Sequence, residues 1–159
     1  MMPESDDKSC DDVSPAQVRI AAMNLLARRE HSCEELSRKL LRRFKDATLV
    51  AQEIERLAAE NLQSDERYAH SFVRQRIARG HGPLRISADA RQRGVASPDL
   101  EAALAENAPD WHEHARQVMV KKFGVGAGQP GDAREMARRV RFMQYRGFAM
   151  EHFAALLDL

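Results

Sequence analysis

Ala90-Arg91-Gln92-Arg93-Gly94-Val95 has two counterparts in this chain, Leu40-Leu41-Arg42-Arg43-Phe44 and Met143-Gln144-Tyr145-Arg146-Gly147-Phe148. Each segment is basic and contains an arginine followed by a glycine or an apolar residue. These arginines recur about every 50 residues, and a period of this length is typical of proteins that stack one supersecondary unit several times. Because stacked helical units form long binding surfaces, the repeat predicts a protein that binds a large partner.

The composition favours helices. Of the 159 residues, 43% are hydrophobic and 31% are charged. Alanine, leucine, arginine and glutamate dominate, and all four are good helix formers. Apolar residues recur at spacings of three and four, as in Val18, Ala22 and Leu25, whereas strands would show alternation. The sequence therefore predicts an all-α fold.

Capping signals predict where the helices begin. Ser14-Pro15 and Ser32 with Glu35 resemble helix starts, and Ser97-Pro98, Ala108-Pro109 and Asp132 are interpreted in the same way. With the apolar spacing, these signals predict nine helices, near residues 15–30, 33–43, 48–61, 65–80, 83–94, 98–107, 109–123, 132–146 and 149–157.

The predicted helices group into tandem three-helix repeats that stack in an elongated, curved array. The expected boundaries are a disordered acidic tail at 1–14, repeat 1 at 15–62, repeat 2 at 63–107 and repeat 3 at 108–159. A glycine-rich stretch at 124–131 is expected to be a mobile loop within repeat 3. Phe44, Val95 and Phe148 are each expected to fill the joint between the second and third helices of their repeat.

The middle helix of each repeat carries a cluster of basic residues. One interpretation is a basic surface that binds phosphates or acidic side chains, and the other is a solvated helix face with i,i+4 ion pairs. We favour the binding surface because the acids lie mainly on other helices, at Glu53, Glu55, Glu60, Glu101 and Glu106. The candidate partner-binding residues are Arg38, Lys39, Arg42, Arg43, Arg85, Arg91, Arg93, Arg138, Arg139, Arg141 and Arg146.

Catalytic and metal-binding motifs are not apparent. His112 and His114 lie two positions apart on a helix and point in opposite directions, so they cannot share an ion. The segment Gly80-His81-Gly82-Pro83 superficially resembles a phosphate loop, but a tight turn between helices is the favoured interpretation, with Gly80 ending one helix and Pro83 beginning the next. We expect no enzyme activity, no cofactor and no metal.

The chain is expected to be cytoplasmic. Cys10 and Cys33 are expected to be reduced thiols, and no apolar stretch is long enough to span a membrane. The acidic N-terminus has no apolar core segment and does not resemble a secretory signal. Net charge is only +1 because the acidic tail offsets a basic remainder.

Several segments together resemble the RecX family of recombination regulators. They are Leu25-Leu26-Ala27-Arg28-Arg29-Glu30-His31-Ser32, Leu62-Gln63-Ser64-Asp65-Glu66-Arg67-Tyr68-Ala69, Phe72-Val73-Arg74-Gln75-Arg76, Gly80-His81-Gly82-Pro83-Leu84-Arg85-Ile86, Arg91-Gln92-Arg93-Gly94-Val95 and Arg141-Phe142-Met143-Gln144-Tyr145-Arg146-Gly147-Phe148. The resemblance covers about residues 15–157. It departs from the family at three points. No glycine stands between Arg43 and Phe44, so the first turn is expected to be tighter or differently closed. Ala90 replaces the usual leucine, and the glycine-rich stretch at 124–131 varies freely in such proteins.

The resemblance implies a non-enzymatic regulator in DNA repair and recombination. It implies binding to the RecA recombinase filament, including DNA within it, and inhibition of the recombinase, ATPase and co-protease activities. We expect a monomer with no membrane contact. Direct binding to single- or double-stranded DNA without RecA is the alternative, and a steep loss of affinity with salt would indicate it.

Overall fold

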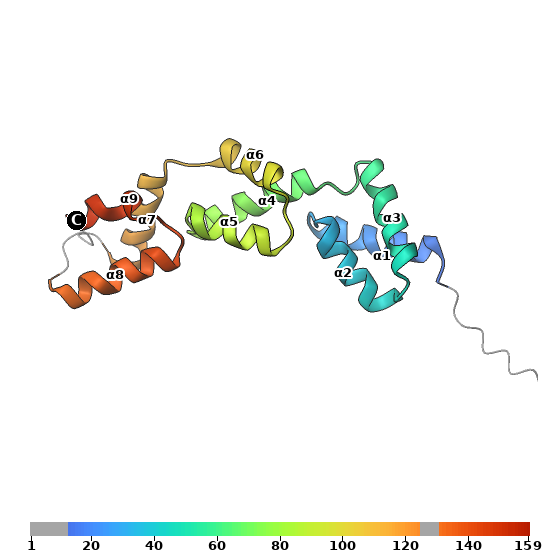
Figure 1. Ribbon diagram of the computed structural model, residues 1–159, viewed down its shortest axis with the longest axis horizontal. Helices are drawn as coiled ribbons and strands as arrows, with labels where there is room; N and C mark the ends of the chain where they lie inside the picture. The colour runs from blue at the N-terminus through green and yellow to red at the C-terminus, as the bar shows by residue number, and fades with distance from the viewer. Residues whose placement is uncertain (1–12, 125–130) are drawn as a thin grey trace, which may run out of the picture. The chain divides into compact units, whose positions relative to one another are not determined.

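The computed structural model describes residues 13–124 and 131–159. Across these two ranges the chain is helical and contains no strand, which confirms the predicted all-α class. The helices are α1 (Pro15–Arg28), α2 (Cys33–Phe44), α3 (Ala47–Ala59), α4 (Asp65–Ala78), α5 (Pro83–Gln92), α6 (Ser97–Asn107), α7 (Trp111–Phe123), α8 (Ala133–Tyr145), α9 (Met150–Phe153) and the 3-10 helix η1 (Ala154–Leu157) (Figure 1).

Most of the predicted acidic tail and of the predicted mobile loop lies outside the described residues. In the described ranges, no helix has both the length and the apolar character that crossing a membrane requires. Cys33 is a free thiol, and Cys10 lies outside the described residues. The chain divides into two compact parts, an N-terminal part that ends at Ser64 and a C-terminal part that begins at Asp65.

The N-terminal part contains α1, α2 and α3, which pack on one another. Their buried residues form one apolar cluster in which Val18, Leu36, Leu40, Val50 and Leu57 are almost completely buried. Local side chains fix the helix starts: the Ser14, Ser32 and Asp46 side chains each accept a hydrogen bond from a backbone amide in the first turn of their helix. The predicted starts at Ser14 and Ser32 are therefore confirmed.

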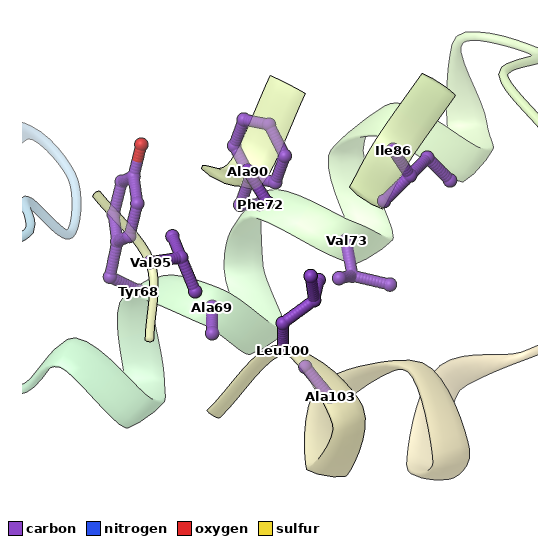
Figure 2. Close-up of a cluster of buried hydrophobic side chains, with 9 residues drawn as sticks. All are labelled: Tyr68, Ala69, Phe72, Val73, Ile86, Ala90, Val95, Leu100 and Ala103. Carbon is purple, nitrogen blue, oxygen red and sulfur yellow. The ribbon is translucent and has the colours of Figure 1, made fainter. Parts of the chain in front are cut away.

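The C-terminal part contains two three-helix groups, each with its own core. In the first group, α4 supplies Tyr68, Phe72 and Val73, which pack against residues of α5 and α6 (Figure 2). In the second group, Met119 of α7 and Met143 of α8 pack against residues of α9 and η1. Trp111 packs against both clusters.

Two helix starts differ from the prediction. Ser97 is the first residue of α6 rather than its cap, and Ala96 stands at the capping position without a side-chain hydrogen bond. Helix α7 begins at Trp111 because Asp110, not Pro109, caps it: its carboxylate accepts from the amides of His112 and Glu113, at 3.0 and 3.2 Å. The cap predicted at Asp132 is confirmed, since its carboxylate accepts from the Glu135 amide at 2.7 Å.

The three basic segments end their helices in two different ways. Gly94 and Gly147 have φ values of +76° and +94°, and the next residues, Val95 and Phe148, donate backbone hydrogen bonds to Ala90 and Met143. This is the Schellman geometry, in which glycine adopts the left-handed conformation at low cost. In the first segment, Lys45 is the left-handed residue, with φ +54°.

The left-handed position corrects the register of the predicted repeat. Because Lys45 corresponds to Gly94 and Gly147, the residue that matches Arg93 and Arg146 is Phe44 and not Arg43. Only Lys45 and Asp46 separate α2 from α3, so the first turn is tighter, as expected. Val95 and Phe148 are buried, as expected of residues that fill the joints, whereas Phe44 is only partly buried against the first cluster.

The two groups of the C-terminal part meet at a backbone junction. The amide of Gly82 donates to the Arg146 carbonyl at 2.7 Å, and the amide of Leu84 donates to the Gly147 carbonyl at 3.0 Å. A Cβ on Gly82 would lie 2.4 Å from the Gly147 oxygen, and a Cβ on Gly147 would lie 2.3 Å from Arg85 Cβ. Gly80 has φ +82° and Pro83 begins α5, which confirms the predicted interhelical turn.

Candidate partner-binding surface

The basic residues of α2 are partly neutralised by acids on the same helix. Arg38 lies 3.8 Å from Glu34, and the Lys39 ammonium lies 3.6 Å from Glu35, both at i,i+4 spacing. Arg29 donates a further hydrogen bond to Glu35 at 3.0 Å. Exposed pairs of this kind are weak, so Arg38, whose side chain is 57% exposed, remains accessible to a partner.

Cations of α1 and α2 line a hollow between these two helices. This hollow has a volume of about 480 Å³, and Leu25 and Leu40 are among the residues that line it. We call it the basic hollow, and its cations are Arg28, Lys39, Arg42 and Arg43. The described residues that line it include no aspartate or glutamate. Arg43 also lies over the Phe44 ring, 5.0 Å from its centroid, which restricts its guanidinium.

On α5 and α4, two arginines share one carboxylate. Asp89 lies 3.2 Å from the Arg76 guanidinium and 3.7 Å from that of Arg85. The Arg76 side chain is 12% exposed, and burial lowers its pKa despite the opposing effect of Asp89; the charges of Arg93, Arg79 and Arg85 lower it further. Asp89 therefore partly neutralises the clustered positive charges of Arg76 and Arg85.

Arg91 and Arg93 end α5 in exposed positions. Arg93 lies over the Phe72 ring, 5.6 Å from its centroid, and neither arginine forms an ion pair with an acid in the part of the chain that the structure describes. Their positive charges are therefore available to a partner.

Two arginines of α8 form ion pairs with the same glutamate, Glu135. Arg138 and Arg139 lie 2.9 and 3.2 Å from the Glu135 carboxylate, and their hydrogen bonds lower the Glu135 pKa to about 2. The Arg139 side chain is only 12% exposed, so it acts mainly within the fold. Arg141 is exposed, and it has no acidic partner among the described residues.

Arg146 lies at the junction of the two groups and not in a free basic stripe. Its guanidinium donates to the Arg79 carbonyl at 2.9 Å. Nearby, the Arg85 guanidinium lies over the Tyr145 ring, 4.8 Å from its centroid. Tyr145 and Leu84 are both exposed, at 71% and 60%.

These contacts correct the expected separation of charge. Acids stand on the middle helices themselves, at Glu34 and Glu35 of α2, Asp89 of α5 and Glu135 of α8, and they pair with Arg38, Lys39, Arg85, Arg138 and Arg139. The candidates without an acidic partner in the described ranges are Arg42, Arg43, Arg91, Arg93, Arg141 and Arg146.

Four further cations lie at hollows and were not among the candidate residues. They are Arg28 in the N-terminal part and Arg79, Lys121 and Lys122 in the C-terminal part. Lys121 and Lys122 are adjacent residues in the last turn of α7, shortly before Gly124. This pair of lysines before a glycine is the sequence signal by which they could have been found. The histidines do not converge on a metal site: His112 packs on His152, whereas His114 packs on Phe148, and the described residues contain no cluster of three His, Cys, Asp or Glu suited to an ion.

These features define a class of protein: an all-helical chain of three-helix repeats whose cations face solvent in hollows and at helix ends. Comparisons with known proteins specify the family. Residues 64–104 match the model described as RecX, second three-helix domain, and residues 110–157 match RecX, third three-helix domain.

Relatives match over almost the whole chain. The regulatory protein RecX of Pseudomonas putida (strain GB-1) is 46% identical over 146 residues, which cover 91% of this chain and 92% of that protein. The regulatory protein RecX of Halorhodospira halophila is 46% identical over 138 residues, covering 87% and 84%. The chain therefore belongs to the RecX family of regulatory proteins.

Two solved structures have the same fold. A crystal structure of regulatory protein RecX aligns with a TM-score of 0.77 at 23% identity, covering 91% of this chain and 73% of the other. A crystal structure of RecX from Lactobacillus salivarius aligns with a TM-score of 0.70 at 19% identity, covering 91% and 96%. At these identities the likeness supports the fold.

Proposed function

We propose that this protein binds the RecA recombinase filament and restrains its recombinase, ATPase and co-protease activities in DNA repair and recombination. It acts by binding and not by catalysis. Membership of a family of regulatory proteins supports a regulatory role. The observation that carries the proposal is the basic hollow, where Arg28, Arg42 and Arg43 are presented together with no acid among the described lining residues.

The basic hollow suits acidic side chains on a protein partner. Guanidinium groups bind carboxylates through two parallel hydrogen bonds, and such charge-assisted bonds are stronger than neutral ones. A filament repeats the same surface along its length, so the separate basic sites of this chain can engage several subunits. Linked contacts of modest strength then give high overall affinity.

Leu84, Arg85 and Tyr145 provide a second contact in this proposal. They lie together because the Leu84 amide bonds to the Gly147 carbonyl and Arg85 covers the Tyr145 ring. Exposed tyrosine and arginine are enriched among the residues that dominate protein interfaces. This apolar and aromatic surface favours a protein partner, since phosphate binding alone would not use it.

The test is charge reversal with a matched control. The double variant Arg42→Glu/Arg43→Glu should lose inhibition of RecA strand exchange. The control Arg74→Glu/Arg134→Glu makes the same change in net charge at exposed positions that line neither hollow. The control should inhibit like the native chain. Full inhibition by the folded Arg42→Glu/Arg43→Glu variant would exclude the basic hollow as a contact.

Direct binding to DNA without RecA is the second candidate. The observation in its favour is the absence of acids from the described lining of both the basic hollow and a second basic pocket at the end of α7. A gel shift on single-stranded DNA at about 0.15 M salt, with and without RecA, separates the two candidates. A shift that requires RecA supports filament binding, whereas the same shift without RecA supports direct DNA binding.

A further inference from the structure

A second basic pocket lies where the two groups of the C-terminal part meet. It has a volume of about 330 Å³ and is formed by the end of α4, one face of α7 and the end of α8. Four cations line it, and Phe142 forms part of its apolar wall. We call it the junction pocket, and its cations are Arg79, Lys121, Lys122 and Arg146.

The charge of the junction pocket is not neutralised within the described chain. No aspartate or glutamate is among its described lining residues. The Arg146 guanidinium donates to a neutral carbonyl, that of Arg79, and not to a carboxylate. By contrast, Arg116 of α7 pairs with Glu113 at 2.9 Å, and Arg138 of α8 pairs with Glu135 at 2.9 Å. The junction pocket is thus a local concentration of unpaired positive charge.

Phe142 holds two of these cations in place. Lys122 lies 5.5 Å and Arg146 lies 5.2 Å from the centroid of its ring, and the Phe123 ring packs edge-on at 5.3 Å. Cation–π contacts restrict these side chains and use none of their N–H donors. Because its ring is already in contact with two cations and Phe123, Phe142 is a poor platform for stacking a nucleobase.

The cations and the size of the junction pocket favour a phosphate ligand. Clustered guanidinium and ammonium groups match the oxygens of a phosphate, and a volume of about 330 Å³ is at the lower end of small-ligand pockets, which span ~300–1,000 Å³. Contacts to phosphate position a nucleic acid without reading its sequence. We propose that the junction pocket is a phosphate-binding site, which accepts the phosphodiester of a nucleic acid backbone or a free phosphate group.

This site is separate from the contacts proposed for RecA, and its test contains no RecA. The full chain is titrated against a fluorescein-labelled oligothymidylate while anisotropy is measured at several salt concentrations. The variant Lys121→Glu/Lys122→Glu should bind about tenfold more weakly, with a salt slope smaller by about 1 for each lysine. The control Arg74→Glu/Arg134→Glu, with the same change in net charge, should bind within about twofold of the native chain.

Competition identifies the source of the phosphate. Displacement of the labelled strand by inorganic phosphate supports a site for free phosphate, and displacement by unlabelled oligothymidylate alone supports a site for the backbone. Equal weakening in the Lys121→Glu/Lys122→Glu variant and the control would overturn the proposal, because binding would then follow net charge. Polyglutamate that competes as well as the oligonucleotide would also overturn it, in favour of a carboxylate site.

A charge-neutral variant guards against misfolding. Glutamate at the C-terminal end of α7 opposes the helix dipole and could destabilise the helix. Lys121→Gln/Lys122→Gln removes the charge without that repulsion and should show a smaller loss of affinity with the same unfolding midpoint as the native chain. Native affinity in this folded variant would also refute the site.

Discussion

Replacing Gly147 with alanine tests the backbone junction in the C-terminal part. Gly147 has φ +94°, and a Cβ there would lie 2.3 Å from Arg85 Cβ and 2.5 Å from the Arg85 amide nitrogen. The left-handed conformation costs a non-glycine residue about 1–2 kcal/mol. The overlap involves backbone, so it is relieved only if the two turns separate.

Separation would break the two hydrogen bonds that join the turns, Gly82 to Arg146 and Leu84 to Gly147. Each contributes about 1 kcal/mol to stability, so the expected loss is about 3–4 kcal/mol in total. Gly124→Ala is the control: Gly124 has φ +89° and ψ 176°, and among the described residues nothing lies within 4 Å of its added Cβ. It should lose only the cost of that backbone conformation, about 1–2 kcal/mol.

Urea unfolding monitored by tryptophan fluorescence measures both losses. Trp111 is the single tryptophan of the chain, and it packs against the cores of both groups in the C-terminal part. The difference of about 2 kcal/mol should place the Gly147→Ala midpoint about 1 M below that of Gly124→Ala. Equal midpoints would refute the junction as a stabilising contact.

Three further predictions concern the same part of the chain. Burial and the charges of Arg85, Arg76 and Arg146 lower the His81 pKa to about 4. As the pH drops, the unfolded state therefore binds a proton on His81 before the folded state does. The free energy of unfolding should fall as the pH drops from about 6.5 to about 4. Unfolding in urea across this range checks it, and His81→Gln should reduce the slope by about 1.4 kcal/mol per pH unit. Asp89→Asn leaves buried Arg76 without its carboxylate and should cost about 2 kcal/mol in the Trp111 unfolding assay, whereas an unchanged midpoint would show that the pair is dispensable. Leu84→Ala/Tyr145→Ala should weaken RecA binding about tenfold in a pull-down titration and leave oligothymidylate binding unchanged, and a loss of both would contradict a protein-specific contact.

Local signals explain why the helices could be predicted well. The caps at Ser14, Ser32 and Asp132 act within one turn, so sequence alone identifies them. The cap of α6 is Ala96, one residue before the predicted Ser97, because Pro98 fits either the first or the second helical position. The residue with left-handed backbone conformation at the end of α2 could not be predicted from the sequence, because it is Lys45 and not a glycine.

The candidate surface was predicted less well, for two different physical reasons. The i,i+4 spacings of Glu34 with Arg38 and Asp89 with Arg85 are visible in the sequence, and giving them more weight would have identified the paired arginines. The junction pocket depends on Gly82 meeting Gly147, a contact between turns far apart in the chain. No local pattern encodes that approach, so only the structure shows that Lys121 and Arg146 share a pocket.

Binding of the RecA filament by the unpaired arginines of the basic hollow is tested by measuring affinity directly. The affinity of Arg42→Glu/Arg43→Glu for RecA filaments on single-stranded DNA is compared with that of the native chain and of Arg74→Glu/Arg134→Glu. We expect a loss of at least about tenfold for the first variant and native affinity for the control. Native affinity in the first variant, or equal losses in both, would contradict it.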